Sequence, residues 1–348
     1  MIEKGCTLLY IPFYLPDHQT TKRKYQYFRN MKQVCLFLLI MVCFSKTNHA
    51  QKVEKFYDYE WRPCEAGSAR FYSQMELKDS GWVRRDYYLP ARTIQMVGLF
   101  KDSSGLVKNG TFIYFHPNKV LSSSGRYVNN KKDGIWISWH ENAFMKDSIV
   151  YDAGEEIGTA LHWHNNGYVQ DSIVHKPDGT AVSVSWFDNG EVSSAGRMNM
   201  LGGYIGKWQF FHKNGQLSSE EVYDNGKLVS RKYYSENGTP QPDTGAVSTP
   251  ASFPGGVEKW TKFLDKNFYW PAHYRLVNGD KAIIRVEFTV DETGTVKDIY
   301  LSVPFEPAFN EIVIRTLRNS PKWIPAVSHN RKIAFVHRQR VGFVENKD

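Results

Sequence analysis

The dominant feature of the sequence is an internal repeat with a period of 24 residues. An aromatic residue precedes a short polar turn in six successive copies, and these aromatics are spaced 24, 24, 24, 24 and 23 residues apart. The pairs are Phe115-His116, Trp139-His140, Trp163-His164, Phe187-Asp188, Phe211-His212 and Tyr234-Ser235. A period of this length indicates a stack of similar small units that share one continuous core.

Each copy has the pattern of a β-hairpin. Asn-Gly pairs such as Asn214-Gly215 follow the aromatic, and Asn-Gly accepts positive φ at little cost, as tight hairpins require. Trp208 and Phe210 alternate with polar residues, which places large apolar groups on one face. One hairpin cannot bury such a face alone, so we predict stacked hairpins over residues 105–238, forming an open sheet solenoid. The first strand of a copy begins at Gly110, Gly134, Gly158 and Gly206, with Val182 and Ser230 in the other two copies.

This pattern resembles the MORN-type repeat in its bacterial variant. The positions that carry the resemblance in the fifth copy are Gly206, Trp208, Phe211, Asn214 and Gly215. An irregular copy at Gly81–Phe100 is expected to cap the array, within an N-terminal segment at 51–104. Repeats of this kind build surfaces, and no single activity follows from them.

Four histidines, His116, His140, His164 and His212, occupy the same slot of the repeat. With two strands per copy, equivalent atoms lie roughly 10 Å apart, whereas zinc–nitrogen bonds are about 2.0–2.1 Å long. Successive histidines therefore cannot share one ion, and we interpret the column as polar strand-end positions. His162 with His164 leaves one local two-ligand alternative.

We predict no metal, no cofactor and no catalytic residues, and therefore a protein that is not an enzyme. The sequence contains no Gly-x-Ser-x-Gly, His-Glu-x-x-His or phosphate-binding loop. A hydrolase or metal enzyme that uses the histidine column remains the alternative from another class.

The repeat ends at Gly238, and the texture of the sequence then changes. Thr239–Ser252 contains three prolines and small polar residues, as in a semi-extended linker. Residues 253–348 alternate between helical and strand periodicity, in the order α-β-β-α-β. The strands are expected at Lys281–Val290, Val296–Val303 and Ile333–Phe343. The predicted fold is mainly β, with an α+β module at the C-terminal end.

Residues 253–345 resemble the C-terminal domain of TonB proteins, in the form common in Bacteroidetes-like envelopes. The motifs are Phe253-Pro254-Gly255-Gly256, the hairpin VEFTVDETGTVKDIYL, and Pro321-Lys322-Trp323 followed by Pro325. We take Pro254, Gly255, Gly256, Pro321, Trp323 and Pro325 as the structural motif. Two departures, Phe309-Asn310-Glu311 and His329-Asn330-Arg331, leave the identity of the partner open.

The resemblance implies that the module adds a short peptide of an outer-membrane receptor, or of another envelope protein, as an extra strand. The residues expected to bind this partner are Arg331, Lys332, Ile333, Phe335, His337, Arg338 and Arg340. The stretch from Ile312 to Val344 contains basic residues and no acidic residue. This charge favours an acidic peptide or an anionic cell-wall surface, and the alternative is that it protects a strand edge from aggregation.

The first fifty residues are expected to be absent from the mature protein. Translation is predicted to begin at Met31, with an apolar run at Val34–Phe44 and cleavage after Ala50, which indicates export to the periplasm. Without residues 1–50 the chain has 37 basic and 34 acidic residues, so a nucleic-acid partner is not expected.

The alternative is an uncleaved membrane anchor. The protein would then be a TonB energy transducer that links inner-membrane motor proteins to outer-membrane receptors, with the repeats as a stiff rod. The sequence does not specify the receptor, the transported substrate or the oligomeric state.

Overall fold

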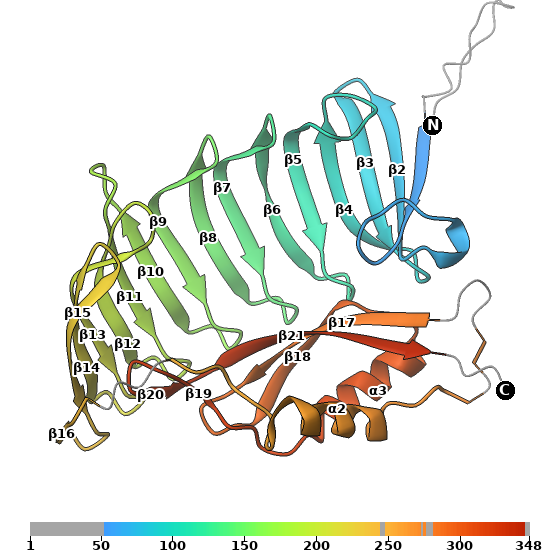
Figure 1. Ribbon diagram of the computed structural model, residues 1–348. Coiled ribbons are helices and arrows are strands. Elements are labelled where there is room, and N and C mark those ends of the chain that lie inside the picture. The colour runs from blue at the N-terminus through green and yellow to red at the C-terminus, as the bar shows by residue number, and fades with distance from the viewer. Residues whose placement is uncertain (1–51, 244–247, 273, 276–280, 345–348) are drawn as a thin grey trace, which may run out of the picture. The chain divides into compact units, whose positions relative to one another are not determined.

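The computed structural model describes residues 52–243, 248–272, 274–275 and 281–344. The predicted start at Met31, the apolar run and the cleavage position at Ala50 lie outside these residues. The chain from residue 50 onward forms one compact unit. Its largest part is one antiparallel sheet of 16 strands that follow one another in sequence order (Figure 1). This arrangement confirms the predicted mainly β fold of stacked hairpins.

The sheet begins before the clear repeats and ends just after them. A 3₁₀ turn at Ala66–Ser68 (η1) lies between its first two strands. The strands are β1 (Lys52–Tyr57), β2 (Phe71–Lys78), β3 (Gly81–Tyr88), β4 (Thr93–Phe100), β5 (Lys108–Phe115), β6 (Leu121–Val128), β7 (Lys131–Trp139), β8 (Met145–Asp152), β9 (Glu155–Trp163), β10 (Val169–His175), β11 (Ala181–Trp186), β12 (Val192–Met198), β13 (Tyr204–Phe211), β14 (Leu217–Asp224), β15 (Lys227–Tyr234) and β16 (Pro240–Gln241).

The turns along the two edges of the sheet have different backbone conformations. In the turn after an aromatic, the last residue alone has positive φ, as at Gly215 with φ 83°. Asn214 is therefore outside the left-handed region, and its Oδ1 instead accepts the N–H of Gln216 at 3.0 Å. On the other edge, Asn225-Gly226 has two positive φ values, 47° and 85°. This second kind matches the two-residue turn expected for Asn-Gly, and the first does not.

The repeated histidines and asparagines connect each hairpin to the next. The His212 Nε2 donates to the main-chain oxygen of Tyr234 at 2.9 Å, and Asn214 Nδ2 donates to that of Glu236 at 2.8 Å. The same bonds join His116 to Trp139 and His140 to Trp163, each at 2.8 Å. The column is therefore a hydrogen-bond ladder that satisfies carbonyl groups at the strand ends. Its histidines act as scaffold in this respect.

The glycines near the start of the repeat strands, two or three residues after the first residue of β7, β9 and β13, produce β-bulges. Gly134, Gly158 and Gly206 have φ values of 71°, 64° and 63°, and the pairing to the preceding strand shifts register beside each of them. Where Val182 replaces this glycine, β10 and β11 pair without a shift. The glycine therefore recurs because the bulge needs a left-handed residue.

Large aromatic side chains cover one face of the sheet by lying across glycines of the neighbouring strand. Trp136 lies against Gly125 and Trp208 against Gly196, and a Cβ at either glycine would collide with the ring. Trp136 is 6% exposed and Trp208 is 2% exposed. These close contacts bury apolar area although only one sheet supplies the rings.

The C-terminal module has its own core. The helices are α2 (Gly256–Asn267) and α3 (Pro307–Arg318), and the strands are β17 (Lys281–Val290), β18 (Val296–Val303), β19 (Ala326–Ser328), β20 (Arg331–Ile333) and β21 (Phe335–Val344). Three of the strands form a sheet in the order β18-β17-β21, and β19 pairs with β20. The predicted last strand, Ile333–Phe343, is therefore divided: Ile333 ends β20, which also contains Arg331 and Lys332, and the long strand β21 begins at Phe335. The alternating side chains of β17 that include Ile284, Val286 and Phe288 are buried with Phe309 and Leu317 of α3.

The turn at Ala143 offers a direct test of the backbone argument. Ala143 has φ 69° in the position where four other copies have glycine and one has Lys119. The left-handed conformation costs a non-glycine residue about 1–2 kcal/mol, and glycine costs about 0.5–1 kcal/mol in the unfolded chain. We expect Ala143→Gly to raise the free energy of unfolding by about 0.5–1 kcal/mol in urea titrations. Glu141→Gly, at a residue of the same turn without positive φ, should lower it; a gain in both variants would contradict the explanation.

Candidate functional site

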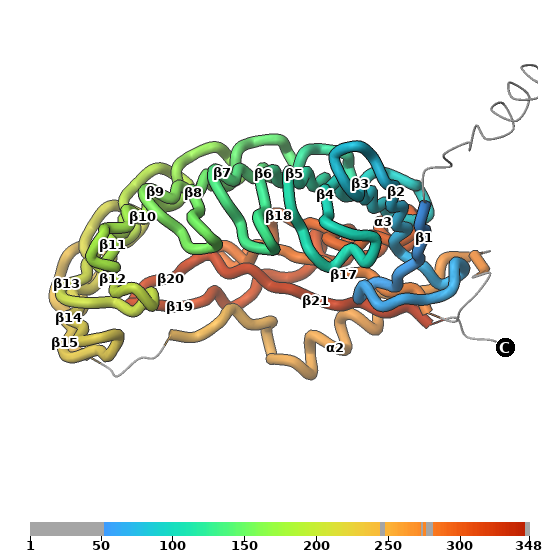
Figure 2. The backbone as a smooth tube through the Cα atoms, turned by 90° about the horizontal axis from the view of Figure 1, so that it is seen from above, coloured from blue at the N-terminus to red at the C-terminus, as the bar shows by residue number. Residues whose placement is uncertain are grey.

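The module contacts the repeat sheet along β18, one edge strand of its own sheet. Figure 2 shows the backbone of the module running along the curved repeat sheet. Residues of β18 and of the turn before it bond to residues of the turns after the repeat aromatics. The pairs are Tyr300 with His116 (3.0 Å), Asp298 with Asn165 (2.5 Å), Lys297 with Asp188 (3.1 Å) and Glu292 with Lys213 (3.2 Å). The β17–β18 hairpin therefore crosses successive hairpins of the repeat, and this edge of its sheet faces the scaffold.

A turn at His329–Arg331, between β19 and β20, inserts into the last part of the repeat sheet. Arg331 is 8% exposed, lies over the rings of Phe187 and Phe210, and donates to the main-chain oxygens of Ser193 and Phe211. Burial lowers the pKa of this guanidinium to about 10. This value is still well above neutral pH, and the group therefore remains charged. Arg331 was predicted to bind a partner peptide, and the structure instead places it inside this contact.

His329 forms the other half of this contact. Its ring stacks on Phe210 with centroids 3.5 Å apart, and its Nδ1 lies 3.0 Å from the carboxylate of Glu221, whose side chain is 3% exposed. Burial would raise the pKa of Glu221, but hydrogen bonds from His329, Tyr223 and Ser219 outweigh it and lower the pKa. We call His329, Asn330 and Arg331 the latch.

A second buried arginine connects the other end of the sheet to the module. Arg70, just before β2, donates to the main-chain oxygens of Ile283 (2.8 Å) and Pro304, and its guanidinium lies 4.4 Å from the ring centre of Phe305. The module is thus fixed to both ends of the repeat array. A stiff rod would hold the module away from the first strands of the sheet. Here the module lies beside those strands.

The opposite edge strand of the module, β21, remains as the candidate binding edge. It pairs with β17 over all ten residues without a register shift, from Phe335–Val290 to Val344–Lys281. Within the described residues, no strand pairs with its other edge. This edge therefore carries a row of main-chain donors and acceptors available to a further strand.

The side chains of β21 alternate between two environments. His337 belongs to the inner face, where it stacks on Phe288 with centroids 5.3 Å apart and lies 3.2 Å from the Ala251 carbonyl oxygen. Burial lowers its pKa, which favours the neutral ring. Phe335 also packs against the module core. Both residues were predicted to touch a partner, and their side chains instead support the strand.

Arg338 and Arg340 lie on the outer face of β21, with side chains 77% and 62% exposed. Arg338 Nε is 3.3 Å from Glu287, and Arg340 is 3.8 Å from Glu60 in the loop after β1. Lys332, on the short strand β20, is exposed, while Ile333 is partly buried against the core. Of the seven predicted residues, these two arginines are the cations on the candidate edge strand.

The predicted structural motif shapes the ends of the module helices and its core. Gly255 and Gly256, which follow Pro254, have φ values of 82° and 77° at the start of α2. Trp323 is 5% exposed in the core, and its main-chain N–H donates to Gly294 at 2.8 Å. Pro321 and Pro325 flank this residue in the segment between α3 and β19.

The sequence did not single out the polar row Asp147–His162–Asp171. His162 Nδ1 is 2.6 Å from Asp147 and its Nε2 is 3.7 Å from Asp171, on the flanking strands β8 and β10. The hydrogen bond that His162 donates to the Asp147 carboxylate raises the pKa of His162. The signal was present, because the two aspartates are 24 residues apart on either side of β9. His164 instead bonds to the Trp186 carbonyl at 2.9 Å, so the two histidines do not act as one pair.

The comparisons support the repeat assignment. Residues 204–225 match the MORN repeat variant, over β13 and β14. None of the curated proteins compared with the chain matches it. Within the described residues, neither α2 nor α3 has the length and apolar character needed to cross a bilayer, and no three His, Cys, Asp or Glu side chains group as metal ligands.

The latch predicts an acid-sensitive contribution to stability. Because the pKa of Glu221 is lowered in the folded state, its contribution is complete above about 4.5 and is lost as the pH falls through the folded value. We expect Glu221→Gln to cost about 1–3 kcal/mol at pH 7 and to lose less stability than the wild type between pH 7 and pH 3. Thermal unfolding across this range measures both effects.

The matched control is Glu220→Gln, the neighbouring carboxylate, which pairs with Lys207 at 2.5 Å. Surface ion pairs contribute about 0–1 kcal/mol, so this variant should resemble the wild type. Identical acid profiles of the wild type and Glu221→Gln would show that the Glu221 carboxylate is not responsible for the acid sensitivity.

Proposed function

We propose that this chain is a non-enzymatic protein of the periplasm whose C-terminal module captures an extended peptide by adding it as a strand to β21. We further propose that the peptide belongs to an outer-membrane receptor, so that the protein takes part in outer-membrane transport. The observation that carries the proposal is the outer edge of β21, ten residues long and unpaired within the described residues, in a sheet whose other edge lies against the repeats.

The regularity of β21 supports a docking role for this edge. Proteins usually interrupt or shorten an exposed edge strand with proline, bulges or covering segments, because a long regular edge recruits other chains. β21 contains no proline and pairs with β17 without a bulge. Strand addition would satisfy main-chain groups of both partners, and the alternating side chains would supply specificity.

The charge on this edge favours an acidic partner. A peptide strand beside β21 would place alternate side chains near Arg338 and Arg340, which lie on the outer face. An acidic residue there would gain a charge complement, whereas a basic residue would meet repulsion. The resemblance to the TonB C-terminal domain supports an outer-membrane receptor as the source of the peptide. An anionic cell-wall surface is the other partner that the same charges would attract.

A pair of neighbouring proline substitutions tests strand addition. Main-chain N–H groups alternate along β21 between β17 and the free edge, so Arg338→Pro and Gln339→Pro remove donors on opposite edges. We expect one variant to destabilise the module and the other to remain folded but bind peptide at least about tenfold more weakly, as the loss of one or two hydrogen bonds predicts. Calorimetric titration with acidic peptides from outer-membrane receptors measures the binding.

Arg338→Ala separates the charge from the backbone effect, since it removes the same cation and keeps the N–H. It should weaken acidic peptides and leave neutral peptides unchanged. Full binding by the proline variant that stays folded would rule out strand addition. Binding to purified cell wall in place of the peptides would reassign the partner.

An anchored TonB energy transducer is the second candidate, favoured by the apolar run at Val34–Phe44 together with the resemblance of the module. The two candidates differ in the N-terminus of the native protein. If the protein is exported and cleaved, N-terminal sequencing of the envelope fraction should begin at Gln51. Retention of Met31–Ala50 would favour the transducer.

A further inference from the structure

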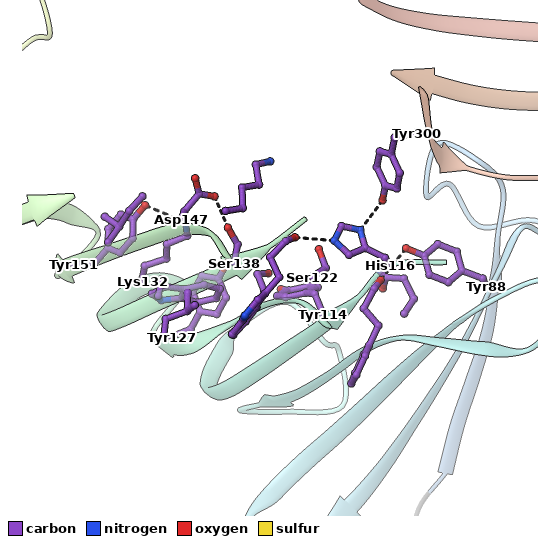
Figure 3. Close-up of a pocket in the computed structure, with 18 residues that line it drawn as sticks. Tyr88, Tyr114, His116, Ser122, Tyr127, Lys132, Ser138, Asp147, Tyr151 and Tyr300 are labelled. Atoms are coloured by element: carbon purple, nitrogen blue, oxygen red, sulfur yellow. Dashed lines mark hydrogen bonds between the residues drawn. The ribbon is translucent and has the colours of Figure 1, made fainter. Parts of the chain in front are cut away.

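A cavity of about 530 Å³ lies over the repeat sheet between β3 and β8, with Tyr300 of β18 on its far side (Figure 3). None of its lining residues belongs to β21, so the cavity is separate from the candidate peptide edge. Eight of its eighteen lining residues carry a hydroxyl group, from five tyrosines and three serines. Four of these hydroxyls already bond within the protein, those of Tyr88, Ser138, Tyr151 and Tyr300, and all eight can still accept a hydrogen bond from a ligand.

Aromatic rings form one wall of the cavity. Tyr127 and Trp136 are in edge contact with centroids 4.8 Å apart. Lys132 Nζ lies 4.9 Å from the ring centre of Trp136 and 4.5 Å from that of Tyr151. This lysine holds the two rings and adds a positive charge beside them, so a cationic ligand would be repelled from this wall.

The polar groups of the cavity are fixed by bonds to the scaffold. His116 bridges the Trp139 carbonyl and the Tyr300 hydroxyl, at 2.8 Å and 3.0 Å. Asp147 is held by Ser138 and by His162. Burial raises the pKa of Tyr300, so that its hydroxyl remains protonated. These groups are positioned before a ligand arrives, which reduces the entropy lost on binding.

The charge of the lining is positive. Lys132 and Lys146 line the cavity with a single carboxylate, that of Asp147, which is already bonded to His162. Lys146 is exposed and makes no ion pair or hydrogen bond within the described part of the chain. Its ammonium group is therefore available to an anionic group of a ligand.

We propose that this cavity binds a short acidic saccharide. Trp136 and Tyr151 are buried, but the partly exposed rings of Tyr127 and Trp139 also line the cavity and match the flat apolar face of a sugar ring. The hydroxyl groups of the lining match the many hydroxyls at the rim of the sugar. The free ammonium of Lys146 supplies the partner for a carboxylate on the sugar. The site does not depend on strand addition, and either function can fail without the other.

Titration calorimetry on the full chain tests the proposal with trigalacturonate, neutral maltotriose and citrate as probes. We expect trigalacturonate alone to bind, and Lys146→Ala to weaken it at least about tenfold, the effect of one lost charged hydrogen bond. Tyr300→Phe should also weaken it, because the hydroxyl that faces the cavity is lost. Lys131→Ala, a neighbouring exposed lysine of β7 outside the lining, should bind like the wild type.

Several results would overturn the assignment. Equal affinity for maltotriose would remove the acidic requirement, and equal affinity for citrate would remove the saccharide. Absence of binding at millimolar trigalacturonate, or unchanged affinity in both Lys146→Ala and Tyr300→Phe, would reject the site. Circular dichroism confirms that each variant is folded. The proline variant of β21 that stays folded should retain saccharide binding.

Discussion

A buried guanidinium must find oxygen acceptors, and Arg331 finds them on the main chain of the repeat sheet. Its partners are the carbonyl groups of Ser193 in β12 and Phe211 in β13. They lie close enough to bind one guanidinium only when these neighbouring strands are paired. The aromatic rings of Phe187 and Phe210 enclose the same group. Placing a charge in such a site is unfavourable unless the acceptors are in position, since an unpaired buried charge costs several kcal/mol. The position of the module against the sheet thus depends on the repeats being folded and stacked.

This docking makes the two edges of the three-stranded sheet unequal. Side chains of β18 bond to the turns of the repeats, as Tyr300 does to His116 and Lys297 to Asp188. β21 lies on the far side of β17, where Arg340 contacts Tyr59 and Glu60 in the loop after β1, but no strand of the described residues pairs with its outer edge. An isolated module of this topology would expose both edges to other chains. The repeat sheet therefore covers the β18 edge and leaves the β21 edge for the strand addition proposed above.

The sequence predicts the parts of this structure that depend on local periodicity. The 24-residue spacing defines the hairpins, and the alternation over Lys281–Val290 defines β17 with its bounds. It does not reveal long-range contacts, because nothing local distinguishes a buried arginine such as Arg331 from the exposed Arg338. The His329-Asn330-Arg331 departure from the TonB pattern was visible, but its partners Glu221 and Phe211 are more than a hundred residues away. The same limit hid the cavity, whose wall needs Tyr300 from β18.

The pair of buried arginines has a consequence for how such a protein can change over evolution. Repeat arrays commonly gain or lose units, because each unit touches only its neighbours. Here two arginines join the C-terminal module to the array, Arg70 near its beginning and Arg331 near its end. The length of the module fixes the distance between these two contacts. Adding or deleting one hairpin unit would displace one anchor by roughly 10 Å along the sheet. Because the module must reach both contacts, the number of repeats should vary far less among related proteins than the surface residues of the repeats.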